Sequence, residues 1–266
     1  MSSNNDNSVR MVENEGDASE TLLELSILDT LDRIINSWTS ETFQNEGVFS
    51  QAVREHIRHV CKCIHYDVHG LSILIDMLQQ HGAQRNSMST SHDVHFISAI
   101  VRQYMNNINR LYDFLAQAIS LILLPQLPSH ISIDSCRMLL EKIENTSEGP
   151  GLPDSLTKVL QLNQPRFDAF QCNYHFVCQH KKDLQFQVRP EGYDMKRPIQ
   201  MGEAIEYLPL LPFLRDMTCS LLTFSEEVAD VISTNYDGFL EPPSISVDLE
   251  GGCIASFVKF LNHDEY

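Results

Sequence analysis

The chain of 266 residues is 42% hydrophobic, which is enough for a core, and its formal net charge is −17. It has no apolar run of about 18 residues and no signal-peptide pattern at its N-terminus, so we expect a soluble intracellular protein with no membrane partner. The charge is concentrated at the ends: residues 1–30 hold one Arg against seven acids, and residues 224–266 hold one Lys against nine. Because the middle lacks a basic footprint, we expect no strong direct DNA binding by this chain alone.

The first part of the chain is predicted to be helical. Residues 1–19 are polar and acidic, which predicts a disordered tail. Beyond them, apolar residues recur every three or four positions, which predicts a bundle of amphipathic helices in a domain spanning residues 20–162. The helices are expected at residues 21–43, 47–82, 92–120 and 132–145. Gly70 is a candidate irregularity in the second helix.

The helix expected at residues 92–120 carries the clearest apolar stripe of the chain. Ser91 or Asp93 can cap its start, and the segment that contains Pro125 ends it. Long helices with wide apolar stripes favour packing against another subunit, although a stripe of this kind also suits an intramolecular core. The candidate subunit-packing residues are Ile97, Val101, Tyr104, Ile108, Leu111 and Leu115.

After residue 162 the pattern changes from helical to alternating. Strands are predicted at residues 172–179, 184–188 and 197–201, with a hairpin turn at 180–183 and a helical piece at 211–217. These elements predict a small β-rich domain over residues 165–223. Residues 224–266 form an acidic extension of unknown fold, in which Ser225 can cap a further helix and residues 242–261 suit two strands. The expected fold class is therefore mainly α, with a helical bundle domain followed by a small β-rich domain.

Histidines and cysteines gather in the sequence HIRHVCKCIHYDVH, residues 56–69. At 100° per residue, His56, His59 and Cys63 fall on one flank of the helix, so they could supply three zinc ligands if a fourth came from elsewhere. Solvated or packed side chains are the more ordinary interpretation, and we predict no metal or cofactor. The stretch REHIRH, which ends at His59, also has the spacing of ribonucleases of the HEPN class, but this spacing arises easily by chance.

No sequence motif supplies a catalytic constellation. The chain contains no GxSxG, P-loop, GxGxxG or HExxH motif. Its seven cysteines include no CxxC pair, and we interpret them as reduced thiols. We therefore expect a protein that is not an enzyme.

The order of local features resembles the Sld-five subunit of the eukaryotic GINS replication complex over residues 21–223. LDRIINSWTSETF is similar to the first helix of that family, and HDVHFISAIVRQYMNNINRLYDF is similar to its long helix. LPDSLTKVL resembles a short segment at the family's domain junction; the residues that match there are Leu152, Pro153, Leu156, Lys158 and Val159. Pro165, Asp168, the strand NYHFVCQ, LQFQV, MGEAIEYLP and PFLRDMTCSLL follow in the family's order. The long helix is less basic than in the family. The family's chain normally ends near a strand that corresponds to TCSLL, so the last 43 or so residues have no counterpart.

The resemblance implies a non-catalytic subunit of a four-chain complex in the nucleus. Its partners would be the three other GINS subunits, with the MCM helicase ring and Cdc-forty-five, in initiation and elongation of DNA replication. The acidic N-terminus and ETLLELSIL could dock a replisome hub. The other helical-first GINS subunit remains an alternative, as do a helical protein-interaction adaptor unrelated to replication and a HEPN-like ribonuclease.

Overall fold

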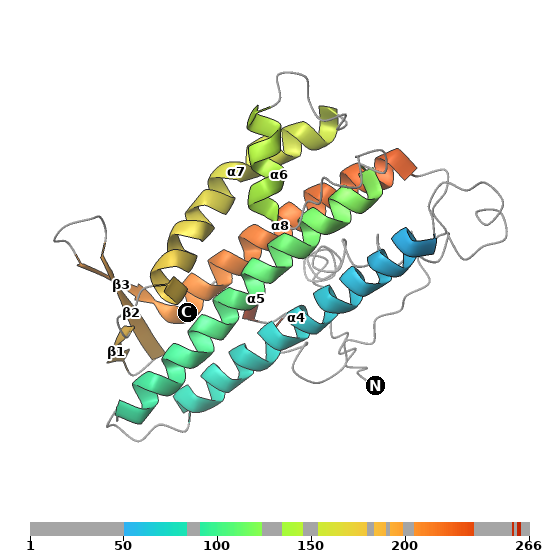
Figure 1. Ribbon diagram of the computed structural model, residues 1–266. Coiled ribbons are helices and arrows are strands. Elements are labelled where there is room, and N and C mark those ends of the chain that lie inside the picture. Colours follow the sequence, from blue (N-terminus) through green and yellow to red (C-terminus); the bar gives the residue numbers. More distant parts are fainter. Residues whose placement is uncertain are drawn as a thin grey trace, which may run out of the picture.

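A computed structural model describes residues 51–83, 91–123, 135–145, 154–179, 184–189, 192–198 and 205–236, together with residues 257, 260 and 261 (Figure 1). The predicted tail at residues 1–19 and the predicted helix at 21–43 lie outside these ranges. In the described part, long helices lie side by side and a small sheet sits at one end of them (Figure 1). The predicted fold class, mainly α with a small β part, is confirmed.

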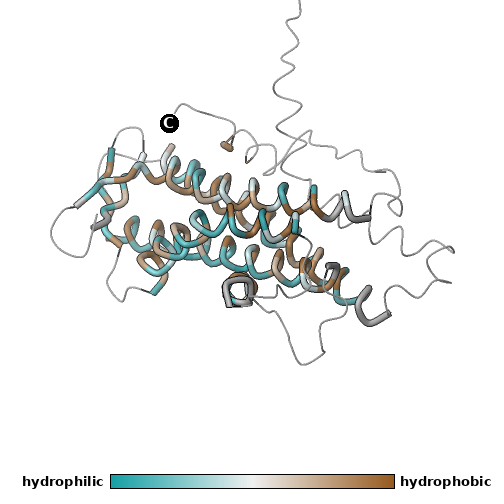
Figure 2. The backbone as a smooth tube through the Cα atoms, turned by 90° about the horizontal axis from the view of Figure 1, so that it is seen from above, coloured by the Kyte–Doolittle hydropathy of each residue, from teal (hydrophilic) through white to brown (hydrophobic). Residues whose placement is uncertain are grey.

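Two helices of equal length form an antiparallel hairpin. α4 spans Gln51–Ala83 and α5 spans Ser91–Leu123, each with 33 residues, or about 50 Å of helix. They match the helices predicted at residues 47–82 and 92–120. Apolar positions along both helices alternate with polar ones (Figure 2), because only one side of each helix faces the core.

Gly70 does not interrupt α4, although the sequence marks it as a candidate irregularity. A Cβ atom at this position would lie 2.8 Å from Nδ2 of Asn107, whose side chain is buried. The glycine therefore allows the backbone of α4 to approach an amide of α5 closely.

α6 is held at its N-terminus by α5. The helix spans Cys136–Asn145, inside the predicted range of 132–145. The backbone N–H of Cys136 donates to Oδ1 of Asp113 at 3.1 Å, and the N–H of Met138 donates to Oγ of Ser135 at 3.3 Å. These two bonds satisfy donors that a helix start leaves open.

The strand predicted at residues 172–179 is wrong. α7 spans Asp154–Tyr174 and continues as a π-helical turn over His175–Gln179. The apparent alternation involves only three residues, whereas buried positions at helical spacing continue through the whole segment: Leu156, Leu160, Asn163, Phe167, Phe170, Asn173 and Val177. α7 changes direction along its length (Figure 1), and Pro165 inside it accounts for a bend.

The sheet has three antiparallel strands in the order β1-β2-β3. β1 spans Gln185–Arg189, close to the strand predicted at residues 184–188, and pairs with β2, Gly192–Pro198. β3, Ile205–Pro209, pairs with the other edge of β2. Only Arg197 and Pro198 of the strand predicted at residues 197–201 lie in β2, and the remaining three residues are not described.

α8 spans Leu210–Tyr236 and is far longer than the helical piece predicted at residues 211–217. It includes the TCSLL segment that the resemblance equates with a strand. Ser225 does not cap a new helix, because its hydroxyl donates to the carbonyl of Leu221 within α8. Phe257, Phe260 and Leu261 are helical and buried, so the predicted strand is wrong at these three positions.

The division into domains stays a prediction. The proposed boundary near residues 162–165 lies inside α7, and the boundary at 223/224 lies inside α8. A continuous set of buried apolar side chains connects the helices with Tyr193 and Met195 of β2. No described helix has the length and apolar character that a bilayer span requires.

Candidate interaction surface

The six candidate subunit-packing residues of α5 lie in the chain's own core. Each of their side chains is at most 3% exposed, so in this fold their stripe is covered by the chain itself. The structure therefore shows the stripe packed inside the chain, which is one of the two alternatives that the sequence left open. The six residues are Ile97, Val101, Tyr104, Ile108, Leu111 and Leu115.

Tyr104 shows how the stripe is fixed. Its hydroxyl lies 2.6 Å from Oγ1 of Thr218 on α8, and Thr218 in turn donates to the carbonyl of Leu214. Tyr104 must therefore be the donor. Burial raises the pKa of its phenol well above the usual range. The bond connects α5 to α8 in the interior of the molecule.

Three of the five residues of the predicted junction motif are described, and they differ in burial. Leu156 is fully buried in α7, Lys158 is exposed and Val159 is half-buried. Leu152 and Pro153 lie outside the described residues. The described part of the motif forms the first two turns of α7, and Leu156 anchors those turns to the core.

The structure brings two members of the histidine and cysteine cluster together. Nε2 of His59 lies 3.6 Å from Sγ of Cys63 on the exposed side of α4. His56 is also exposed, yet among the described residues no three His, Cys, Asp or Glu side chains are placed to share a metal ion. The side chain of Arg54, which the ribonuclease interpretation needs, is not among those described.

An ion pair between a buried carboxylate on α4 and a half-exposed guanidinium on α5 connects the two helices. Nε of Arg110 donates to Oδ2 of Asp67 at 3.0 Å, and Nη2 of Arg110 also contacts Oδ1. The Asp67 side chain is 2% exposed and that of Arg110 is 50% exposed. This bidentate pair gives a buried carboxylate its counter-charge and joins the two helices of the hairpin.

A groove opens to the surface between α6 and α7. Its volume is about 390 Å³, near the lower end of the roughly 300–1,000 Å³ that is usual for ligand pockets. Its residues come from α6, from α7 and from the start of the π-helical turn that follows α7: Arg137, Leu140, Glu141, Gln164, Phe167, Asp168, Gln171, Cys172 and His175.

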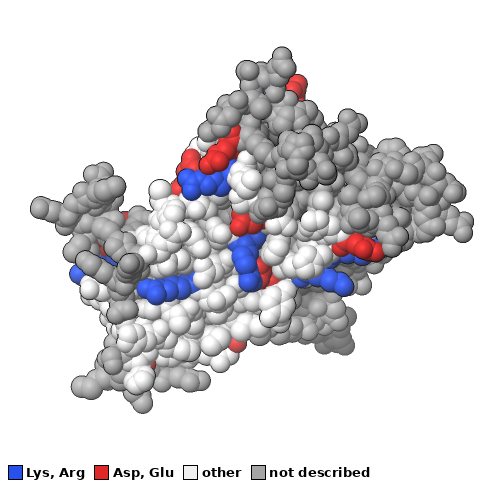
Figure 3. Space-filling model, viewed as in Figure 1, with Lys and Arg blue, Asp and Glu red and all other residues white. Residues whose placement is uncertain are grey.

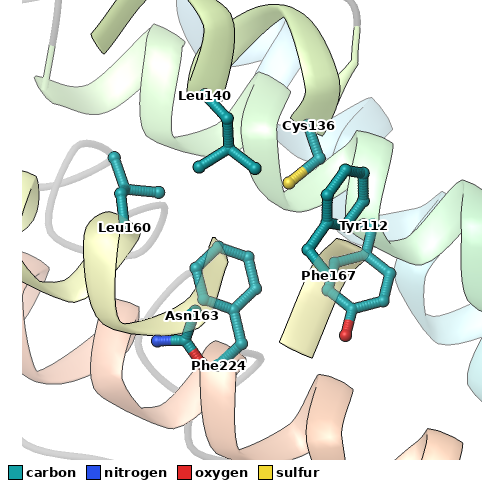
Figure 4. Close-up of a pocket in the computed structure, with 7 residues that line it drawn as sticks. All are labelled: Tyr112, Cys136, Leu140, Leu160, Asn163, Phe167 and Phe224. Atoms are coloured by element: carbon teal, nitrogen blue, oxygen red, sulfur yellow. The ribbon is translucent and has the colours of Figure 1, made fainter. Parts of the chain in front are cut away.

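The floor of the groove belongs to a close-packed part of the core. Leu140 and Phe167 line the groove and also belong to a cluster that α5, α6, α7 and α8 share (Figure 4). The ring centroids of Tyr112 and Phe167 lie 5.2 Å apart in an edge-to-face arrangement, and those of Tyr112 and Phe224 lie 5.9 Å apart. Such packing makes the floor rigid.

Amide side chains hold the α7 wall of the groove against α5. Nε2 of Gln171 donates to Oδ1 of Asn109 at 3.0 Å, and the hydroxyl of Tyr174 donates to Oδ1 of Asn106 at 3.1 Å. On the opposite wall, Asp113 anchors α6, and burial raises the pKa of the Asp113 carboxyl despite its bond to Cys136. Both walls are therefore fixed to the same helix.

The charges around the groove are unequal. Nε of Arg137 pairs with Oε1 of Glu141 at 3.3 Å along α6. Asp168 on α7 is exposed and has no hydrogen bond or ion pair with any described residue. Figure 3 shows acidic and basic side chains side by side over α7, while much of the remaining described surface in this view is uncharged. The groove thus combines an apolar floor with a carboxylate that has no ion-pair partner in the described part of the chain.

Tyr112, beneath the groove, offers a test of the packing. Its hydroxyl is buried and makes no hydrogen bond within the described part of the chain. We expect Tyr112→Phe to raise the free energy of unfolding by about 1 kcal/mol, because a buried unsatisfied hydroxyl is costly. Urea denaturation measures the change. Tyr104→Phe is the matched control and should lower stability by about 1 kcal/mol; a loss at both positions would show that Tyr112 has a partner.

The sequence did not indicate this groove, because its walls come from helices whose facing sides are set only by tertiary packing. Comparisons with known proteins add no assignment: no protein family, no curated protein and no solved structure matches the chain. The groove between α6 and α7 is accordingly the candidate site that rests on the structure alone.

Proposed function

We propose that this chain is a non-catalytic helical subunit that acts by binding other proteins. The observation that carries the proposal is the α6–α7 groove, with its rigid apolar floor and fixed walls. Elsewhere on the described surface, the side chain of Leu162 on α7 is 71% exposed, and Tyr66 on α4 is 76% exposed. Large apolar side chains and a rigid concavity are the features that a protein partner can bury.

Within this class we propose a GINS subunit of the Sld-five type. The support is the resemblance of residues 21–223, in which a helical part precedes the β-containing part. Two segments, NYHFVCQ and TCSLL, no longer support the resemblance, because they are helical where the family has strands. The proposed role is assembly with the three other GINS subunits in the nucleus, and with the MCM ring and Cdc-forty-five during DNA replication.

A helical adaptor unrelated to replication is the second candidate. The groove and the exposed apolar side chains support it equally, since neither feature specifies the partner. The two candidates differ in the proteins that they predict will accompany the chain.

Affinity purification of the tagged full-length chain, followed by mass spectrometry, tests these proposals. Recovery of the three other GINS subunits in stoichiometric amounts supports the GINS assignment. A different stable set of partners supports the adaptor and contradicts GINS. RNA cleavage by the purified chain that is lost on His59→Ala would instead favour the nuclease and overturn the non-catalytic proposal.

A further inference from the structure

We propose that the α6–α7 groove receives an arginine side chain from a segment of a partner protein. This inference rests on the proposed protein-binding function and specifies the chemistry of the partner. It follows from the charges, the floor and the size of the groove, which are considered in turn below.

The charge in the groove favours a cation. Two carboxylates, Glu141 and Asp168, stand on opposite walls, and a single cation, Arg137, lies among the lining residues. Arg137 pairs with Glu141, whereas Asp168 has no counter-charge among the described residues. With neutral histidine, the lining carries a formal charge of −1. An incoming guanidinium would supply the ion pair that Asp168 lacks.

The floor distinguishes arginine from a small cation. Leu140 and Phe167 form an apolar base on which a methylene stem can pack while its charged end reaches the rim. A guanidinium is planar, weakly hydrated and able to stack on an aromatic ring, which lysine does less well.

The size of the groove limits the occupant. A volume of about 390 Å³ accommodates one or two side chains of an extended segment, not a whole helix, which is 10–12 Å across. The floor is closed underneath by Tyr112 and Phe224, so deeper insertion would require repacking of the core. The site therefore suits a short linear segment with an arginine at its centre.

Fluorescence anisotropy with synthetic peptides tests the proposal on the full chain. The probes are fluorescein-labelled heptapeptides GSLXLSG, in which X is arginine, citrulline, lysine or glutamate. We expect the arginine peptide to bind most tightly and citrulline, which has the same shape without the charge, to raise the Kd about tenfold. Equal binding of arginine and citrulline peptides, or no binding of the arginine peptide, overturns the proposal.

Substitution at the groove provides the matched control. Asp168→Asn should weaken the arginine peptide about tenfold and leave the citrulline peptide unchanged. Asp216→Asn, at an exposed position of α8 outside the groove, should change neither. If both substitutions weaken binding equally, the attraction is due to the net charge of the chain and the groove is not the site.

Cys172 offers a direct readout of occupancy. It lines the groove and is exposed, as is Cys219 on α8 outside it. Saturating arginine peptide should slow the alkylation of Cys172 by N-ethylmaleimide at least about fivefold and leave Cys219 unaffected, as measured by mass spectrometry of proteolytic peptides. Unchanged alkylation of Cys172 would place the peptide elsewhere. If these peptide tests fail while affinity purification still recovers partners, only the arginine assignment is wrong.

Discussion

Arg110→Met is expected to lower the free energy of unfolding by about 2–3 kcal/mol. The substitution keeps the length and apolar stem of the side chain but leaves the Asp67 carboxylate, 2% exposed, without its partner. Breaking a fully buried pair costs roughly 3–5 kcal/mol. The expected loss is smaller here because Arg110 is half exposed and water can reach the vacated position. Urea denaturation followed by circular dichroism measures it.

Two controls show whether the cost comes from the unpaired carboxylate. Arg137→Met breaks an exposed pair along α6 and should cost less than about 0.5 kcal/mol. The double substitution Asp67→Leu with Arg110→Met removes both charges and should recover most of the loss, because a well-packed apolar pair can replace a buried ion pair. If the double variant is no more stable than Arg110→Met alone, packing rather than charge explains the effect.

The hairpin of α4 and α5 could be predicted because its signal is long and local. Both helices carry more than eight turns of apolar positions at helical spacing, and Gly70 alone is too weak an irregularity to stop one. The segment at residues 172–179 was misassigned because three alternating residues suit a strand as well as a helix. The segment is helical because Phe170, Asn173 and Val177, at helical spacing, are buried against neighbours that are distant in the sequence.

The candidate site could not be predicted for a related reason. A periodic stripe shows which side of a helix is apolar but not which element covers it, so the stripe of α5 suited a partner and the chain's own α8 equally well. The groove arises where Leu140 and Phe167 meet, and its negative charge depends on Asp168 having no ion-pair partner among the described residues. Neither property is local in sequence.

Tyr104→Asp is expected to unfold the chain, not to release a folded subunit from a partner. The substitution removes a fully buried aromatic side chain, and truncation of a large core residue alone costs roughly 3–5 kcal/mol. It also places a carboxylate in the buried space that the phenol ring occupied, where burial penalises the charged form, and it leaves Thr218 without its Tyr104 partner. The combined loss, more than about 5 kcal/mol, reaches the total stability of many domains.

Thermal melting monitored by circular dichroism, together with size-exclusion chromatography, distinguishes the two outcomes. Ala99→Asp introduces the same charge at an exposed position of α5 and should leave the melting transition and elution volume nearly unchanged. A Tyr104→Asp chain that melts cooperatively like the unsubstituted protein, but no longer recovers its partners, would mean that the stripe is an intersubunit face. If Tyr104→Asp loses the melting transition while Ala99→Asp keeps it, the apolar stripe of α5 is needed for the chain's own core. Partners must then bind at other surfaces, such as the α6–α7 groove.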